Sequence, residues 1–189
     1  MKKIVFALML LITTINMMAQ EHLSFKGIPI KGSMTEFCQK LKAKGFTNIG
    51  SENHLTLFAG DFTGRNATIG VAATEDGKSV FAIIVLFDPN GEWNTLVNTY
   101  SYYKDLYTRK YGKPIIVTEK NPAYSDSNTA LMAEVNEGTA VWGSAWQVTG
   151  GDIELSIEKS SGFYEGVVVI RYRDSQNIEA KIQKDLEDI

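Results

Sequence analysis

The sequence is poor in the residues that most often mark a chemical site. It has one cysteine, Cys38, and two histidines, His22 and His54, among 189 residues. One cysteine excludes an internal disulfide. Zinc sites need three or four Cys, His or carboxylate ligands at defined spacing, and no such cluster is present. We therefore predict no metal site, no cofactor and no catalytic residue, and we expect Cys38 to be a small buried side chain.

Two catalytic alternatives are weak. His54 lies beside Ser51 and Glu52, but a Ser/His/acid set depends on the geometry of the fold, so neighbours in sequence prove nothing. Glu154 and Glu158 fall on one face of a predicted strand, about 13 Å apart at roughly 3.3 Å per residue. That separation is too large for a glycosidase pair, which favours a solvated strand face.

Long apolar runs are missing beyond the N-terminus. Lys2 and Lys3 precede an apolar stretch over 4–15, and the small residue Ala19 follows it. This order predicts a secretory signal peptide over 1–19, because the run is only about a dozen residues and a membrane helix needs roughly 20. We expect a periplasmic or secreted protein with no transmembrane segment after signal cleavage.

Positive charge is not in excess. The chain has 19 Lys and Arg against 22 Asp and Glu, which gives a net charge of −3. Binding to phosphate backbones needs a concentrated positive field, so we expect no nucleic acid partner.

The first half of the chain carries a helix and then strands. Ser33 and Glu36 form the pattern of a capping box, which predicts a helix over 34–44. Alternation predicts strands over 54–60 and 66–72, after a short hairpin over 23–30. The run from Val80 to Phe87 is apolar at every position, so we expect a strand covered on both faces.

The second half has the same order. A long helix is predicted over 92–111, where Gly112 and Pro114 end it. Strands are predicted over 115–118, 140–148, 153–158 and 164–173, with a short helix over 129–136 and a C-terminal helix over 175–188. The apolar face of the long helix consists of Trp93, Leu96, Val97, Tyr100, Tyr103, Tyr107 and Tyr111.

These elements predict one α+β domain over 20–189, with an antiparallel sheet and helices packed on one face. The order of a helix followed by three or four strands occurs twice, which suggests αβ repeats over 23–88 and 89–174 before the C-terminal helix.

The segment over 25–46, FKGIPIKGSMTEFCQKLKAKGF, resembles the opening of secreted Bacteroidetes proteins whose function is uncharacterised. Tyr111-Gly112, Trp146 and the strands over 153–157 and 167–172 are similar to their second half. The plan of two helix-plus-sheet repeats also resembles the β-lactamase-inhibitor-protein fold. That resemblance implies binding of other proteins across the exposed sheet or its loops. This chain departs from that fold because one cysteine cannot form its disulfides, and no inhibitory loop residues can be matched.

The aromatic residues are the only feature of the sequence that points to a binding surface. Trp142 and Trp146 are four apart on a predicted strand and so point to the same face. Core packing is the leading interpretation of these residues and of Phe58. If they face outward, Trp142, Trp146, Phe58 and Tyr102 form a candidate binding surface, because Tyr102 points away from the apolar face of its helix.

The sequence thus favours an exported, noncatalytic binding module for a protein partner or a second copy of the chain. An envelope assembly or structural factor, a carbohydrate or small-ligand binder, and a hydrolase remain as alternatives.

Overall fold

A computed structural model describes residues 21–187, and the predicted signal peptide over 1–19 lies outside this range. The predicted α+β class is confirmed by an eight-stranded antiparallel sheet, a two-stranded hairpin and four helices within these residues. The helices are α1 (Met34–Ala43), α2 (Trp93–Tyr111), α3 (Asn128–Glu137) and α4 (Ser175–Glu187). The strands are β1 (Ser24–Phe25), β2 (Ile28–Pro29), β3 (Thr47–Glu52), β4 (Leu55–Phe62), β5 (Arg65–Ala73), β6 (Val80–Phe87), β7 (Ile116–Lys120), β8 (Val141–Val148), β9 (Gly151–Lys159) and β10 (Gly166–Asp174).

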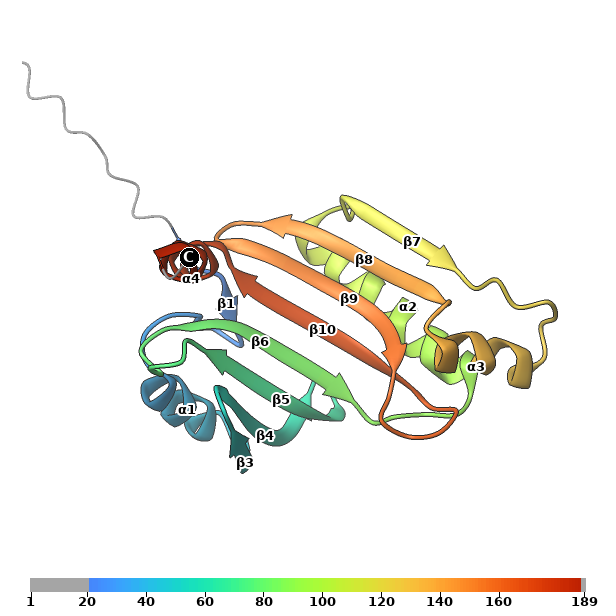
Figure 1. Ribbon diagram of the computed structural model, residues 1–189, viewed down its shortest axis with the longest axis horizontal. Helices are drawn as coiled ribbons and strands as arrows, with labels where there is room; N and C mark the ends of the chain where they lie inside the picture. The colour runs from blue at the N-terminus through green and yellow to red at the C-terminus, as the bar shows by residue number, and fades with distance from the viewer. Residues whose placement is uncertain (1–20, 188–189) are drawn as a thin grey trace, which may run out of the picture.

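The large sheet consists of two halves of four strands each. Its order is β3-β4-β5-β6-β10-β9-β8-β7, so each half is an antiparallel meander and the halves meet where β6 pairs with β10. Helix α1 precedes the first meander and α2 precedes the second, as Figure 1 shows. Each half thus combines a preceding helix with four strands, and the two repeats over 23–88 and 89–174 stay a prediction.

Helices α1, α2 and α3 pack on one face of the sheet. The predicted apolar face of α2 lies there, and Trp93, Leu96, Tyr100, Tyr103 and Tyr107 are all buried. They pack against the side chains of the strands in a single core. Burial of this face, more than helix propensity, stabilises α2, because its β-branched and aromatic residues are only moderate helix formers.

Helix α1 begins with the predicted capping box. The Glu36 backbone N–H donates to Ser33 Oγ at 3.3 Å, and the Ser33 backbone N–H donates to Glu36 Oε2 at 3.1 Å. The hydrogen bond with the Ser33 backbone lowers the pKa of the Glu36 carboxyl most, and the hydrogen bond with the Ser33 side chain lowers it further. Such a cap stabilises a helix by about 1 kcal/mol.

Strand β3 is absent from the sequence prediction. It lies at one edge of the sheet, is largely exposed, and contains a β-bulge between Asn48 and Gly50. Because an edge strand of this kind has no buried face, its sequence shows no alternation that could reveal it.

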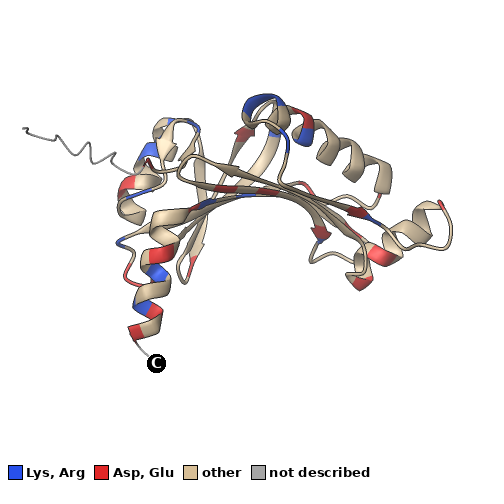
Figure 2. Cartoon of the chain, turned by 90° about the horizontal axis from the view of Figure 1, so that it is seen from above, with Lys and Arg blue, Asp and Glu red and all other residues tan. Residues whose placement is uncertain are grey.

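The prediction that β6 is covered on both faces is wrong within the described chain. Ile83 and Val85 are fully buried under the helices, but Ile84 and Leu86 point to the other side and are only half-buried. The neighbouring strands β5 and β10 cover them in part, without a second layer. Helix α4 lies on that side of the sheet, opposite α2 (Figure 2), and contacts β6 near Val80, so it covers this face only at one end.

Candidate functional site: the open face of the sheet

We call the face of the sheet that points away from α1, α2 and α3 the open face. Side chains alternate along each strand, so the register of the sheet assigns them to one side or the other. The open face is apolar along β4 to β6 and charged along β9 and β10. Its principal residues are Leu55, Leu57, Ile84, Leu86, Asp152, Glu154, Ser156, Glu158, Arg171 and Arg173.

The apolar part, which we call the apolar strip, consists of Leu55, Leu57, Ile84 and Leu86, all half-buried. Its side chains come together above Gly70 of β5, which has no side chain of its own. A β-carbon at Gly70 would lie 3.2 Å from Leu55 Cδ1 and 3.6 Å from Ile84 Cβ. Because Gly70 has no side chain, the residues of β4 and β6 on either side of it form one continuous apolar surface. The sequence held a signal for it, because the segment Leu55 to Phe58 carries apolar residues on both faces.

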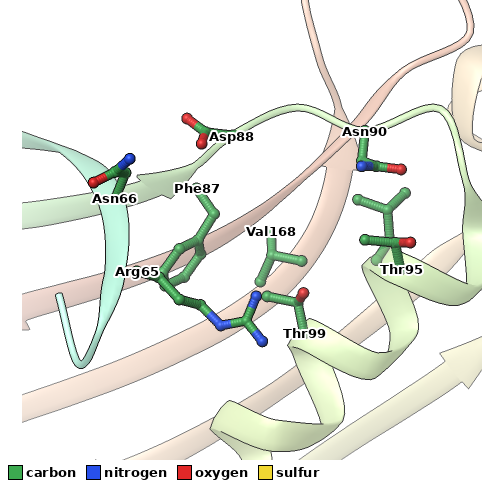
Figure 3. A pocket seen from close by; sticks show the side chains of 9 residues that line it. Arg65, Asn66, Phe87, Asp88, Asn90, Thr95, Thr99 and Val168 are labelled. Carbon is green, nitrogen blue, oxygen red and sulfur yellow. The ribbon is translucent and has the colours of Figure 1, made fainter. Parts of the chain in front are cut away.

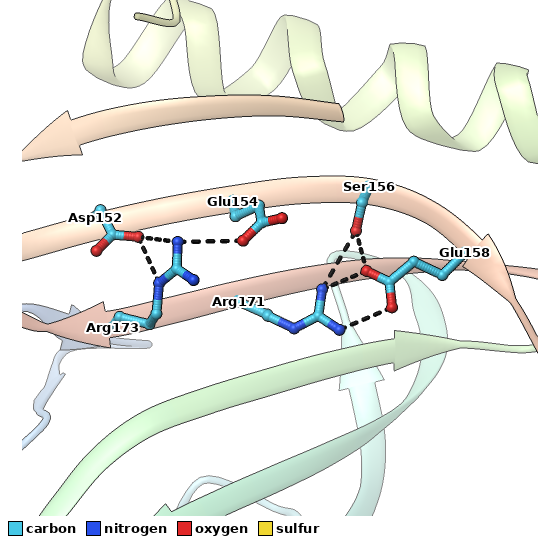
Figure 4. Close-up of polar contacts among 6 residues, drawn as sticks. All are labelled: Asp152, Glu154, Ser156, Glu158, Arg171 and Arg173. Atoms are coloured by element: carbon cyan, nitrogen blue, oxygen red, sulfur yellow. Dashed lines mark hydrogen bonds and ion pairs between the residues drawn. The ribbon is translucent and has the colours of Figure 1, made fainter. Parts of the chain in front are cut away.

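The charged part is a ladder of ion pairs along β9 and β10 (Figure 4). Arg171 Nη2 donates to Glu158 Oε2 at 2.8 Å. Arg173 Nε donates to Asp152 Oδ1 at 2.7 Å, and its Nη2 lies 3.1 Å from Glu154 Oε2. Glu154 and Glu158 are therefore held by arginines, and their surroundings are more structured than the predicted solvated strand face.

The electrostatics of the ladder favour fixed charges. Burial raises the pKa of Glu158, but hydrogen bonds from Arg171 and Ser156 outweigh it and leave this pKa below its usual value. The same pairing with Glu158 raises the pKa of Arg171. A carboxylate that is held ionised by an arginine is a poor general acid, so the ladder is suited to recognition.

Helix α4 stands beside one end of the open face (Figure 2). Lys181 of this helix shares a shallow hollow of about 510 Å³ with Leu55, Phe81 and His54. Further along α4, Ile182 is 44% exposed and Leu186 is 54% exposed. These two apolar side chains of α4 are thus left exposed on the same side of the sheet as the apolar strip.

The predicted aromatic binding surface is wrong for three of its four residues. Trp146 is 1% exposed and its Nε1 donates to the Gly112 carbonyl at 3.0 Å, while Phe58 is fully buried. Trp142 lies on the same side of β8 as Trp146, as the spacing predicts, but this side faces α2. Its ring packs edge-on against Trp93 at 5.1 Å between centroids.

Tyr102 is exposed, as expected from its position on α2. Its ring lies 5.8 Å from the Arg65 guanidinium carbon. Because α2 covers the other side of the sheet, the structure does not bring Tyr102 to the open face.

The remaining candidate residues are dispersed. His54 is exposed in the turn between β3 and β4. Cys38 is half-buried, and burial raises the pKa of its thiol. His22 is held against the end of β10, because its Nδ1 lies 3.1 Å from Asp174 Oδ2. Between residues 21 and 187, no group of three or more His, Cys, Asp or Glu side chains is arranged to hold a metal ion.

No helix in the described part of the chain has the length and apolar character needed to cross a membrane. Comparison with known proteins found no matching family model, no matching curated protein and no matching solved structure.

Proposed function

We propose that this protein is an exported, noncatalytic binding module whose open face docks a protein partner. The observation that carries the proposal is the apolar strip, whose four residues stay only half-buried, beside a ladder of fixed charges. Protein interfaces commonly combine an apolar centre with a polar rim. The export signal predicted over 1–19 supports a location outside the cytoplasm.

The two parts of the face supply different contributions to binding. Burial of the apolar strip would contribute roughly 25 cal/mol per Å² of apolar surface removed from water. The charges of the ladder are already held by their mutual bonds, so little side-chain entropy is lost when a partner docks. Three carboxylates face two arginines in this ladder, namely Asp152, Glu154 and Glu158 against Arg171 and Arg173. The surplus negative charge suits a partner whose apolar surface is bordered by hydrogen-bond donors or basic groups.

The test is capture and crosslinking of the partner from native envelope and secreted extracts. Leu57→Lys places a charge in the apolar strip, where its stem can lie along the surface and keep the fold intact. Tyr124→Lys is the matched control, because Tyr124 is 91% exposed in the loop between β7 and α3. Circular dichroism and urea unfolding would verify that both variants fold.

The proposal predicts that wild type and Tyr124→Lys retain one specific protein and that folded Leu57→Lys loses it. A photocrosslinker at position 57 should then join the chain to that protein, and one at position 124 should not. Equal retention by all three proteins, or no crosslink at position 57, would reject the open face as a docking surface. A crosslink to a second copy of the chain would replace the partner by a homodimer.

A further inference from the structure

A separate cavity lies at the carboxyl end of β6, between the β4–β5 hairpin and the first turns of α2 (Figure 3). Its volume is about 280 Å³, which is enough for a ligand of monosaccharide size. Its wall combines three apolar residues with six polar ones. The apolar residues are Phe87, Leu96 and Val168, and the polar residues are Arg65, Asn66, Asp88, Asn90, Thr95 and Thr99. We call this cavity the Arg65 cleft.

The guanidinium of Arg65 has no acidic partner in the described structure. The other three arginines of the chain all form ion pairs, Arg109 with Asp105 and the remaining two within the ladder. Figure 3 shows the Arg65 side chain extending beneath Phe87 toward Thr99, so its charged end points into the cleft. An arginine keeps its charge at all relevant pH values and offers a planar set of donors that matches a carboxylate.

Neutral hydrogen-bonding groups surround this charge. Thr95 and Thr99 are one turn apart on α2, so they lie on the same side of the helix. Thr99 is only 7% exposed, whereas Thr95 is exposed at the mouth of the cleft. Asn90 Oδ1 accepts from the Glu92 N–H at 2.8 Å, which fixes its amide group at the rim. Thr95 is exposed and Asn90 is half-buried, so a polar ligand can replace the water that these groups otherwise bind.

Asp88 completes the rim on the other side. Figure 3 places its carboxylate beyond the Phe87 ring from the Arg65 guanidinium. It does not neutralise Arg65, and it can accept a hydrogen bond from a hydroxyl group. The cleft therefore offers one cationic group that can bind an anion, several groups that can bind hydroxyl groups, and an apolar wall against which the carbon atoms of a ligand can pack.

We infer that the Arg65 cleft binds a small hydroxylated carboxylate of the sugar-acid class, with the carboxylate on Arg65 and the hydroxyl groups on Thr95 and Thr99. A simple inorganic anion would use the guanidinium and leave the neutral groups unbonded. This inference is independent of the proposed function, because the groups assigned to the ligand, Arg65, Thr95 and Thr99, belong to neither the apolar strip nor the ladder.

The experiment is calorimetric and NMR titration of the purified protein with D-glucuronate, D-glucose and acetate. D-Glucuronate should bind with a Kd below about 1 mM and shift the amide signals of Asn66 and Thr99. D-Glucose and acetate should each bind at least about tenfold more weakly, because D-glucose lacks the carboxylate and acetate lacks the hydroxyl groups. Equal affinity for acetate and D-glucuronate would overturn the sugar-acid assignment, and no binding of D-glucuronate would overturn the site.

Variants locate the ligand. Arg65→Gln should weaken D-glucuronate binding at least about tenfold by removing the charge-assisted pair, and Thr99→Val should weaken it by a smaller factor. Arg109→Gln is the matched control, since Arg109 is an exposed arginine of α2 outside the cleft. Unchanged affinity in Arg65→Gln, or an equal loss in Arg109→Gln, would contradict the inference. Binding to the partner of the open face should persist in Arg65→Gln, which separates the two proposals.

Discussion

His22 Nδ1 lies 3.1 Å from Asp174 Oδ2, and this contact joins two residues that are 152 positions apart in the chain. Asp174 is fully buried at the end of β10. Its carboxylate also accepts from the Leu23 N–H at 2.9 Å and from the Asn177 N–H at 3.0 Å. It therefore caps α4 and anchors the N-terminal segment at the same time.

Asp174→Ala should lower the free energy of unfolding by about 3 kcal/mol, because it removes a helix cap and leaves the buried Leu23 N–H without an acceptor. Urea unfolding measures this change. Asp126→Ala, at an exposed loop position, is the control and should change stability by less than about 0.5 kcal/mol. A similar small change in both variants would show that Asp174 does not anchor this corner.

The backbone of Gly150 packs closely against the same N-terminal segment that Asp174 holds. Its φ is +84°, and a β-carbon there would lie 2.3 Å from the Glu21 carbonyl oxygen and 2.4 Å from the Leu23 nitrogen. Gly150→Ala should therefore destabilise the protein by about 3 kcal/mol or more and release the N-terminal segment to proteases. Gly77→Ala is matched in backbone, with φ of +66°, but has nothing within 4 Å of its β-carbon. That control should cost only about 1 kcal/mol, and equal losses would indicate that backbone strain alone is responsible.

The two tryptophans of β8 should respond differently to replacement by phenylalanine. Trp146 Nε1 donates to the Gly112 carbonyl, whereas Trp142 Nε1 is buried and has no partner in the described chain. Trp146→Phe loses a hydrogen bond and leaves a carbonyl unsatisfied, while Trp142→Phe removes an unsatisfied donor. We expect Trp146→Phe to be the more destabilising by about 2 kcal/mol in chemical denaturation. Equal losses would mean that water or another group satisfies Trp142.

Buried tyrosines should make the protein sensitive to alkali. Burial raises the pKa of Tyr100 to about 12, despite its hydrogen bond with Ser144, and burial likewise raises the pKa of Tyr107 well above its usual value of 10.0. Above pH 10 the unfolded chain loses phenolic protons that the folded chain keeps, so the free energy of unfolding falls as pH rises. This contribution is complete below pH 10 and is lost as pH rises through about 12.

Tyr100→Phe should reduce that alkaline loss by an amount on the order of 2 kcal/mol, measured as the difference in unfolding free energy between neutral and alkaline pH. Tyr124→Phe, at an exposed position, should leave the alkaline loss unchanged. An identical pH profile for wild type and Tyr100→Phe would contradict the assignment.

The ladder gives a prediction for acid. In wild type the pKa of Glu158 is lowered, so its contribution to stability is present above the usual value of 4.5 and is lost as pH falls through the lowered pKa. Arg171→Met removes the main hydrogen bonds and keeps the burial, so the pKa of Glu158 should rise above 4.5. A carboxyl-carbon NMR titration would measure it. Arg173→Met, which leaves Arg171 in place, should keep the pKa of Glu158 low.

Local features of the sequence predicted much of the secondary structure. Ser33 and Glu36 fixed the start of α1. Gly112 and Gly138 mark the ends of α2 and α3, because φ is positive at both positions, +89° and +76°, and only a residue without a β-carbon adopts such values easily. The apolar spacing along α2 predicted its buried face. These signals depend on residues within one or two turns of each other, so the sequence determines them without the fold.

Faces and partners were decided by tertiary structure. The spacing of Trp142 and Trp146 determined that they share a side of β8, but only the packing of α2 decided that this side is the core. The uncovered second face of β6, the pairing of Arg171 with Glu158, and the gathering of Arg65 with Thr99 all join elements distant in the chain. The sequence determined an α+β chain with these helices and most of these strands. The sites depend on how the strands pair and which face each helix covers, and those choices follow from the burial of the whole sheet.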